Sequence, residues 1–460
     1  MEKKYIGGKV IASGGFGCVF NPALKCVGSK KRERNKVSKL MKTKYAIEEY
    51  TEITAIKKKL DKIPNYTNYF IINNLTLCKP SKLTTTDLNS FSEKCSALPK
   101  NDITQQNIND KLQNLMILNI PHGGIPVDDY VYTNMNNTFN MGKLCYKLKD
   151  MLKKGIIPMN EQNVYHCDIK DSNVLVQQNN DVFMTRLIDW GMATSYIPFV
   201  TETFPKSWTN RPLQYNVPFS VIIFSDTFAE KYTTYIQNNN YTDVDNLYNF
   251  VVSYIHLWNK ERGTGHFTLI SNILSMLFKE DYAYDKKEQT IKHVADYIVT
   301  ILHNFTKIND EFVFVGLRKY LDEVFIKIID IYGFICIYYP LLELLYDNYN
   351  NLSPIQLQLF EITKYIFIKY LYTPRIQPYH LTELFNDLDR LHHFVKGTNA
   401  YNTSSANSNS NKTSSKLYNS IKTSNPLKLS SKRTTSKYMT ASKFDYNTKN
   451  KTRRIKKKYS

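Results

Sequence analysis

Short apolar segments separated by turn-forming residues make up the first third of the chain. Residues 9–11 and 18–20 are extended apolar segments on either side of a turn at 12–17, Ala-Ser-Gly-Gly-Phe-Gly, which predicts two strands joined by a glycine loop. Apolar residues then recur every three or four positions over 46–63, which predicts a helix with one apolar face. Further strands are expected at 35–41, 69–77 and 115–120.

Longer helical patterns follow residue 121. Apolar residues recur at helical spacing over 144–152, 244–258, 266–278, 288–305, 312–331 and 355–372. Before them, residues 78–113 are polar and predict an inserted surface segment. The pattern indicates an α+β chain with a sheet-rich N-terminal lobe over 1–121 and a larger helical C-terminal lobe over 122–395.

The end of the chain differs from both lobes. From about residue 396 the apolar periodicity stops, and Ser, Thr, Asn and Lys dominate. Such a composition cannot bury enough apolar surface to offset the chain entropy, so we expect a disordered tail over 396–460. Residues 401–460 carry 12 Lys and 3 Arg against one Asp, which is most of the net charge of +20. The basic run 453–458 could bind nucleic acid or an anionic surface or act as a nuclear import signal; a solvated end is the alternative.

The cysteines and the most apolar run bear on the protein's environment. The seven cysteines are scattered and form no C-x-x-C pair, which predicts neither a zinc site nor a disulfide framework. The apolar run 328–346 is interrupted by Asp330, Pro340 and Glu343, which favours a buried helix pair over a membrane span. We also expect no signal peptide, and therefore a soluble protein in a reducing compartment.

Residues 165–176 hold the strongest concentration of reactive side chains. Asp168, Lys170 and Asn173 lie within one polar loop, which leads into an apolar segment. At this spacing a carboxylate that accepts a hydroxyl proton, a cation facing phosphate and an amide facing a metal can converge on one point. The alternative is a polar loop in which Asp and Asn only form turns.

Two further segments have the chemistry of a phosphate site. Asp189 ends an apolar strand and is followed by Trp190 and Gly191, so its carboxylate could hold Mg²⁺ against phosphate oxygens. The glycine loop at 12–17 offers backbone N–H groups to phosphates. Taken alone, each also fits a plain structural interpretation, a strand end before a turn and a hairpin.

In this order and at these distances, the three segments resemble those of the eukaryotic-type protein kinases. Residues 11–19 are similar to the glycine-rich loop, 166–173 to the catalytic loop, and 189–191 to the magnesium-binding D-F-G. Lys39 falls where the strand lysine that grips the ATP phosphates should lie. The resemblance covers residues 5 to about 225, and it implies a bilobal protein kinase-like fold that uses ATP and Mg²⁺.

The resemblance also implies a role for each residue. Asp168 would accept the hydroxyl proton and Lys170 would neutralise the transferring phosphoryl group, while Asn173 and Asp189 would bind Mg²⁺. Lys39 would orient ATP, held by an acidic residue of the next helix. The other expected ATP contacts are Ile11, Ala12, Gly14, Gly15, Phe16, Gly17 and Val19.

Some positions around the nucleotide leave alternatives open. Glu49 shares the apolar face of the helix over 46–63 and is the first choice as the partner of Lys39, with Glu52 the second. Pro-His-Gly-Gly at 121–124 resembles the hinge that binds adenine through its backbone. Ile11, Val19 and Ile117 are candidates for the purine slot, or ordinary core residues.

Departures from the kinase pattern narrow the resemblance. Ala12 replaces the first loop glycine, which is tolerable if this residue keeps a negative φ. Cys167 replaces the arginine that often pairs with an activation-loop phosphate, which argues against dependence on such phosphorylation; a small buried filler is the alternative. No Ala-Pro-Glu follows, and residues 210–219 occupy that region. This segment and the Gly-Gly hinge resemble the divergent kinases of large cytoplasmic DNA viruses, which would imply a host-cytoplasmic or virion location.

The expected activity is transfer of the γ-phosphoryl group of Mg-ATP to Ser or Thr hydroxyls of protein substrates. Lys170, two residues after Asp168, resembles the Ser/Thr rather than the Tyr kinases. One alternative is a pseudokinase, a nucleotide-binding or scaffold module that keeps the fold without the activity. Another is a small-molecule kinase of related fold. The protein substrate, the activating input and the oligomeric state do not follow from the sequence.

Overall fold

The computed structural model describes residues 8–179, 182–238, 243–279, 285–307 and 315–397. The chain divides into two units, residues 1–409 and 410–460, and every described residue belongs to the first. The predicted tail begins within the last helix, which continues to Gly397. The remainder of that tail, with its basic run at 453–458, lies outside the described residues.

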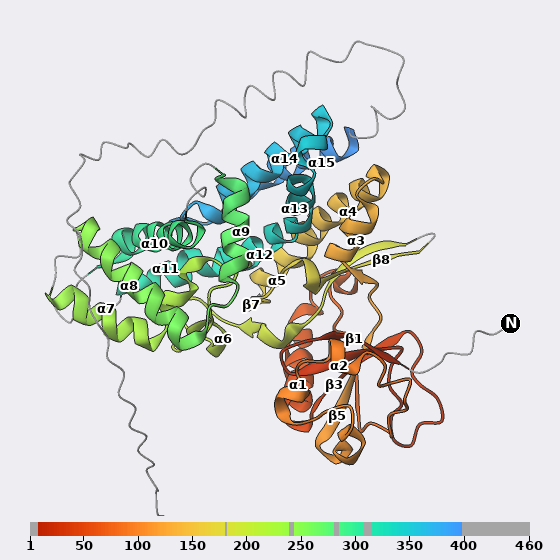
Figure 1. Cartoon of the computed structure of the whole chain (residues 1–460). Helices are drawn as coiled ribbons and strands as arrows, with labels where there is room; N and C mark the ends of the chain where they lie inside the picture. Colours follow the sequence, from red (N-terminus) through yellow and green to blue (C-terminus); the bar gives the residue numbers. More distant parts are fainter. Residues whose placement is uncertain (1–7, 180–181, 239–242, 280–284, 308–314, 398–460) are drawn as a thin grey trace, which may run out of the picture. The chain divides into compact units, whose positions relative to one another are not determined.

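An antiparallel sheet with the strand order β1-β2-β3-β5-β4 forms the N-terminal region (Figure 1). Its strands are β1 Lys9–Ser13, β2 Gly17–Asn21, β3 Lys36–Lys42, β4 Thr76–Cys78 and β5 Leu115–Pro121. The helix α1, Thr43–Leu60, follows β3 and buries Ala46, Ile53, Ile56 and Leu60, the face that the apolar spacing predicts.

The strand expected over 69–77 is only partly formed. Thr76–Cys78 pairs with β5, whereas Tyr69, Phe70 and Ile71 are buried outside the sheet. Ile71 N–H donates to Leu187 O at 3.0 Å, and Leu187 N–H donates to Tyr69 O at 2.8 Å. The backbone of residues 69–71 therefore forms hydrogen bonds with Leu187 of the C-terminal region instead of with the N-terminal sheet. A local apolar pattern does not reveal such a distant partner.

The segment 78–113 is more than a surface insertion. It contains α2, Phe91–Lys94, and several 3-10 turns, and it buries apolar residues against the sheet. The shared core comprises Leu83, Leu88, Phe91, Leu98, Ile103 and Ile108 from this segment and Val10, Phe20, Leu40 and Ile117 from the strands. The expectation of a segment lying on the surface is wrong in this respect, because its few apolar residues all point to one side.

Two disulfides join described residues of this region, Cys18–Cys95 and Cys26–Cys78. Their Cα atoms are 5.4 and 5.8 Å apart, within the usual range for a disulfide. The prediction of no disulfide framework is wrong, and the argument from cysteine spacing for a reducing compartment fails with it. The partners are 77 and 52 residues apart in sequence, so no local motif marks them.

Helices make up most of the C-terminal region (Figure 1). They are α3 Val127–Asn134, α4 Thr138–Met151, α5 Ile157–Glu161, α6 Lys206–Thr209, α7 Asp226–Asn238, α8 Val244–Arg262, α9 Phe267–Leu277, α10 Lys286–Phe305, α11 Val315–Tyr320, α12 Ile326–Cys336, α13 Tyr339–Asp347, α14 Pro354–Phe367 and α15 Leu381–Gly397. Short strands complete it: β6 Ile125–Pro126, β8 Val174–Gln178 and β9 Phe183–Leu187 form one sheet, and β7 Val164–Tyr165 pairs with β10 Thr194–Ser195. The prediction of an α+β chain with a sheet-rich N-terminal and a helical C-terminal region is confirmed.

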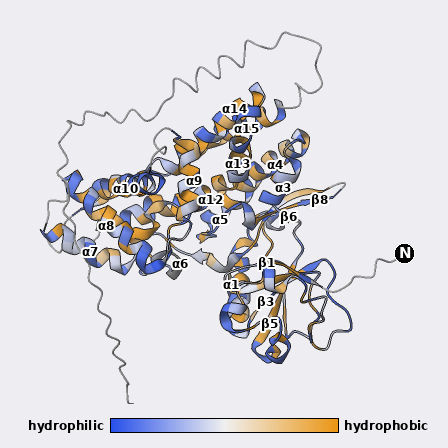
Figure 2. Cartoon of the chain, in the orientation of Figure 1, coloured by the Kyte–Doolittle hydropathy of each residue, from blue (hydrophilic) through white to orange (hydrophobic). Residues whose placement is uncertain are grey.

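The core of the C-terminal region lies along the run from α11 to α13. Among the described residues, Gly316–Asp347 is long enough, and contains a window of 18 residues apolar enough, to cross a membrane by length and composition. Of this window, 89% is buried inside the protein, which is the behaviour of core helices. Figure 2 shows apolar residues along α12 and the helices beside it.

Candidate active site

Lys39 of β3 forms a buried ion pair with Glu49 of α1. The Lys39 Nζ atom lies 2.8 Å from both carboxylate oxygens, and each residue is only 7% exposed. Glu49 shares the inward face of α1 with the apolar residues, whereas Glu52 is exposed, so Glu49 is the partner of Lys39. Lys39 Nζ also lies 3.2 Å from Asp189 Oδ1, which joins the strand lysine to the loop after β9.

The carboxylates of Asp189 and Glu49 stabilise the positive charge of Lys39. Burial alone would lower the pKa of Lys39, but Asp189 and Glu49 outweigh it and raise that pKa above its ordinary value. A cation is therefore fixed in the middle of β3 at neutral pH, with its Nζ atom held by both carboxylates.

The catalytic-loop candidates converge as their spacing predicts. Lys170 Nζ lies 3.0 Å from Asp168 Oδ2, and Asn173 Nδ2 donates to Asp168 Oδ2 at 2.9 Å and to its backbone oxygen at 2.8 Å. Asn173 ends a 3-10 turn, Asp171–Asn173, that leads directly into β8. The turn is what folds residue i+5 back onto residue i.

Arg211 and Asn216 also hold Asp168, and the sequence did not single them out. Arg211 Nη2 lies 3.0 Å from Asp168 Oδ1, and Asn216 Nδ2 donates to the same oxygen at 2.9 Å. Arg211 also donates through Nη1 to Cys167 O. Both belong to the segment 210–219, whose departure from the kinase pattern was the signal that could have found them.

Burial alone would raise the pKa of Asp168, but the positive charges of Arg211 and Lys170 hold that pKa below its ordinary value. Both carboxylate oxygens also accept hydrogen bonds in their ionised form. Asp168 is therefore an ionised acceptor at neutral pH, with each oxygen held in place.

Asp330 of α12 holds the backbone of the same loop through hydrogen bonds. Its Oδ2 accepts the backbone N–H of His166 at 2.9 Å, and its Oδ1 accepts that of Cys167 at 2.8 Å. Asn160 donates to Oδ2 at 2.7 Å. An acidic residue inside an otherwise apolar helix is the sequence signal for such a role, because a buried carboxylate must find donors.

Left-handed backbone conformations occur on both sides of the site. Cys167 and Asp189 have φ of 61° and 62°, which is uncommon for residues other than glycine. The Trp208 indole N–H donates to Cys167 Sγ at 3.2 Å. Next to Asp189, Trp190 is buried and packs edge-to-face on His166, whose Nε2 donates to Ile188 O at 2.9 Å. Cys167 is thus a small buried residue in a tight turn.

The glycine loop lies between β1 and β2 and covers Lys39. Gly14 N–H donates to Gly17 O at 2.9 Å, and a Cβ atom on Gly14 would lie 3.7 Å from Lys39 Cε. A Cβ on Gly17 would lie 2.3 Å from Met41 Cγ, so this glycine is required by the packing of β2 on β3. Ala12 keeps a negative φ, as its substitution for glycine requires.

The side chains proposed for the purine slot divide between the two faces of the sheet. Val19 and Leu118 lie directly opposite Lys39 in register, so they share its face. Ile117 lies opposite Leu40 and belongs to the core under segment 78–113, so its assignment to the slot is wrong. Ile11 is 39% exposed, and Phe16 is 52% exposed and packs on Tyr45 of α1.

Gly124 of the expected hinge has φ of 106°, and a Cβ there would meet Val176 O at 1.9 Å. A non-glycine residue would be strained at this position and would also clash with the backbone of β8. This glycine is thus required where the chain passes from β5 to β6.

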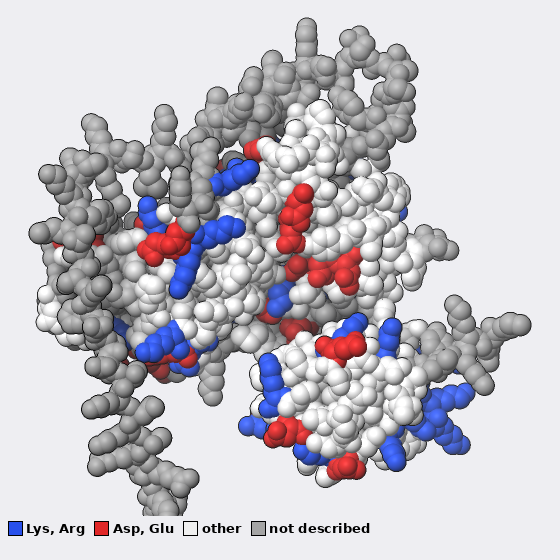
Figure 3. Space-filling view, viewed as in Figure 1, with Lys and Arg blue, Asp and Glu red and all other residues white. Residues whose placement is uncertain are grey.

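Acidic side chains gather around α3 and α13 (Figure 3). Asp128 and Asp129 lie in the first turn of α3, and Glu343 of α13 accepts hydrogen bonds from the hydroxyls of Tyr132 and Tyr339. Burial, with the nearby charge of Asp128, raises the pKa of Asp171 to about 6, although Tyr215 donates to it at 2.6 Å. A negative surface therefore lies beside Asp171, whereas Asp168 is surrounded by the positive charges of Arg211 and Lys170.

The residues expected to bind Mg²⁺ have suitable donor atoms. The Asn173 amide nitrogen is engaged by Asp168, which leaves its oxygen as the atom for a cation. The Asp189 side chain is 40% exposed, so its carboxylate can reach a ligand. Among the described residues, no group of three or more His, Cys, Asp or Glu could hold a metal on its own. The pair fits Mg²⁺, which takes few protein ligands when phosphate oxygens supply the others.

No protein-family model matches this chain, and no curated protein is significantly similar to it. The assignment of the site therefore depends on the geometry of the residues themselves.

Proposed function

We propose that this protein is an ATP- and Mg²⁺-dependent protein kinase with a bilobal kinase-like fold that phosphorylates Ser and Thr. The observation that carries the proposal is the convergence of residues 150 positions apart, since Lys39 contacts both Glu49 and Asp189. The second cluster, around Asp168, supports the proposal because it brings together a carboxylate, a cation and an amide, the three kinds of group that phosphoryl transfer uses.

Each residue has a task that its contacts support. Lys39, fixed by Glu49, neutralises and orients the nucleotide phosphates, while Asp189 and the Asn173 oxygen hold Mg²⁺. Bound Mg²⁺ would offset the negative charge that develops as the γ-phosphoryl group of ATP is transferred. Lys170 adds a cation on the substrate side.

Asp168 receives the substrate hydroxyl. Its low pKa keeps it ionised, so it accepts a hydrogen bond from the hydroxyl and orients the oxygen. It takes the hydroxyl proton as the bond from that oxygen to the γ-phosphorus forms, while the bond from the γ-phosphorus to the bridging oxygen breaks and ADP leaves. A weak base suffices, because a loose transition state requires little proton transfer early in the reaction. The acidic surface of α3 and α13 would favour substrate segments that carry Lys or Arg near the phosphorylated residue.

The test is the variant Asp168→Asn, assayed with radiolabelled Mg-ATP on a basic protein and by thermal shift with Mg-ATP. We expect phosphoryl transfer to fall by about 10²–10⁴-fold, because the proton acceptor is lost. The thermal shift should persist, because Lys39, Asp189 and Asn173 remain. Asp245→Asn, at an exposed position of α8, is the matched control and should keep full activity.

Each contrary result has its own meaning. Undiminished phosphorylation by Asp168→Asn would refute the assignment of Asp168. A parent protein that shifts with Mg-ATP and labels nothing would be a pseudokinase. Label on a metabolite with none on protein would indicate a small-molecule kinase.

A further inference from the structure

The Cys18–Cys95 disulfide attaches segment 78–113 to the strand that leaves the glycine loop. Cys18 directly follows Gly17 in β2, and Cys95 directly follows α2. Both are buried, at 0% and 2% exposure. The end of the loop is therefore covalently attached to a part of the chain 77 residues away in sequence.

The other end of the glycine loop is held by the residues next to Cys95. Ser13 is the last residue of β1, and its Oγ accepts the backbone N–H groups of Ser96 and Ala97, each at 3.1 Å. The Ser96 hydroxyl lies 3.2 Å from the same oxygen. Segment 95–97 therefore contacts both ends of the loop within three consecutive residues.

Additional contacts hold the preceding residues of segment 78–113 against β1. Val10 N–H donates to Asn89 O at 3.3 Å, and Gly8 N–H donates to Asp87 Oδ1 at 2.8 Å. Asp87 in turn forms an ion pair with Arg32 at 2.9 Å. Residues 87–89 are thus held by β1 and Arg32, and Cys95 and Ala97 of the same inserted segment are buried in the shared core, so segment 95–97 can serve as a fixed support.

The tip of the loop lacks comparable support. A Cβ atom on Gly15 would have no described atom within 4 Å, and Phe16 is half exposed. A loop fixed only at its ends can close on phosphates, yet it loses less conformational freedom on binding than a loop that is free throughout.

We propose that segment 95–97 is a positioning tether that holds the glycine loop over Lys39 in the conformation that receives the ATP phosphates. This inference rests on the proposed function, because it assigns the loop to nucleotide binding. Cys95, Cys18 and Ser13 are then positioning residues, which act on the nucleotide through the backbone of residues 14–17.

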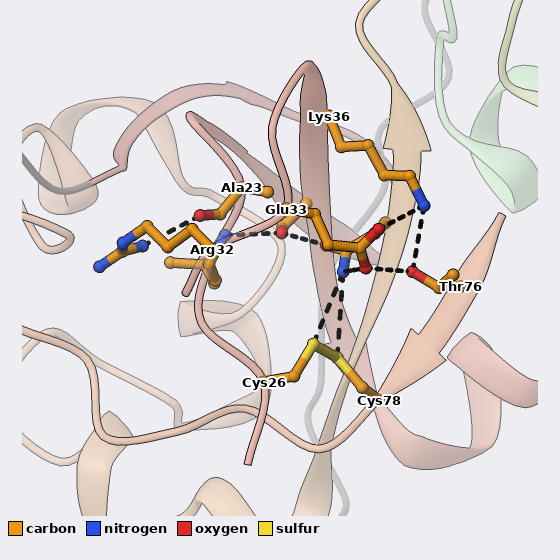
Figure 4. Close-up of a disulfide and its surroundings, with 10 residues drawn as sticks. Ala23, Cys26, Arg32, Glu33, Lys36, Thr76 and Cys78 are labelled. Atoms are coloured by element: carbon orange, nitrogen blue, oxygen red, sulfur yellow. Dashed lines mark hydrogen bonds and ion pairs between the residues drawn. A yellow bond between two sulfur atoms is a disulfide. The ribbon is translucent and has the colours of Figure 1, made fainter. Parts of the chain in front are cut away.

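The second disulfide provides a matched control. Cys26–Cys78 lies in the same region and closes a loop of similar length, with a sequence separation of 52. Its surroundings are Asn119, whose Nδ2 lies 3.6 Å from Cys26 Sγ, and Glu33, Lys36 and Thr76 (Figure 4). None of these residues belongs to the glycine loop. Loss of the Cys26–Cys78 disulfide should therefore lower the stability of the protein without changing the glycine loop.

The experiment compares the double variants Cys18→Ser/Cys95→Ser and Cys26→Ser/Cys78→Ser in the full chain. Both should melt at lower temperature, because each loses a cross-link over a long loop. Only the first should raise KM for ATP, by about tenfold, with kcat within about twofold of the parent. Ser13→Ala keeps both disulfides, and it should raise KM for ATP in the same direction, by about threefold, with little change in melting temperature.

Several outcomes would overturn the tether. Equal KM values in the two double variants would make the Cys18–Cys95 effect one of general stability. An unchanged KM for ATP in Ser13→Ala would also contradict the tether. If the cysteine variants fail to fold, the KM of Ser13→Ala alone tests the tether. A parent that binds Mg-ATP while no variant alters KM refutes the tether alone; a parent that binds no Mg-ATP refutes the proposed function and the tether with it.

Discussion

The catalytic loop and the glycine loop are held in opposite ways. Around Asp168, side chains from two distant segments, 210–219 and α12, and Asn173 of the loop itself fix both carboxylate oxygens and the backbone N–H groups of the two preceding residues. Around Gly15, hydrogen bonds from segment 95–97 and the disulfide hold only the ends of the loop, and the tip has one side-chain contact, the half-exposed Phe16 on Tyr45. The comparison indicates that the surroundings of Asp168 are rigid, whereas the tip of the glycine loop is free to adjust.

The difference has an energetic basis. A buried carboxylate needs several donors, and each donor removed leaves a polar group unsatisfied at about 1–3 kcal/mol. The exposed loop tip has no such requirement, because water can satisfy its N–H groups. Substitutions should therefore have unequal effects in the two places.

The largest effect is expected for Asp330→Ala. It removes the acceptor of the His166 and Cys167 N–H groups and leaves Asn160 without its carboxylate partner. We expect a loss of about 3–5 kcal/mol in the free energy of unfolding, measured by chemical denaturation. Phe16→Ala is the matching variant in the glycine loop, and it should change the free energy of unfolding by less than about 1 kcal/mol. Similar losses in the two variants would contradict the comparison.

An intermediate effect is expected for Arg211→Gln. Removing this charge takes away the largest influence that opposes burial at Asp168, so the pKa of Asp168 should rise. The acid limb of the kcat/KM profile should then move to higher pH, because the acceptor must be ionised. Arg211→Lys keeps a positive charge near Asp168, so its acid limb should move less than that of Arg211→Gln.

Arg390→Gln, which removes an ion pair to Asp387 on α15, is the control for Arg211→Gln and should leave the pH profile in place. An unshifted profile in Arg211→Gln, with only lower stability, would mean that Arg211 is purely structural.

The smallest effect is expected for Asp171→Asn. Burial raises the pKa of Asp171 from 3.8 to about 6, so the folded protein binds this proton more tightly than the unfolded chain. Stability of the parent therefore falls as pH rises between these values and stays lowered above them. Asparagine cannot ionise, so at pH 7 the variant should be more stable by about 1–3 kcal/mol, seen as a higher melting temperature.

This advantage of Asp171→Asn should disappear near pH 4, where Asp171 of the parent is protonated as well. Asp168→Asn provides the contrast in the same loop. Because the pKa of Asp168 is lowered, its neutralisation should reduce stability at pH 7. If both variants changed stability at pH 7 in the same direction, the opposite pKa shifts of Asp171 and Asp168 would be contradicted.

Residues brought together by local spacing were predictable from the sequence. The Asp168, Lys170 and Asn173 cluster needs only a turn, and Glu49 follows from its place on the apolar face of α1. The α+β organisation followed from a change in apolar period near residue 121. The kinase-like interpretation itself remains a proposal.

Residues that support the site from afar were not predictable. Arg211 and Asp330 lie 43 and 162 positions from Asp168, and their role depends on tertiary packing. The same holds for Cys18 and Cys95, and for Ile117, whose face of β5 is decided by the segment packed on it. Periodicity tells which side is buried, but it does not tell what buries it.

The disulfides also determine how the protein must be prepared. Among the described residues, Cys145, Cys167 and Cys336 are the free cysteines, and all are buried. A correctly matured chain should therefore show three reactive thiols after denaturation, whereas a chain made without access to an oxidant shows seven. Thiol counting before any assay would separate a protein that lacks activity from one that was never cross-linked.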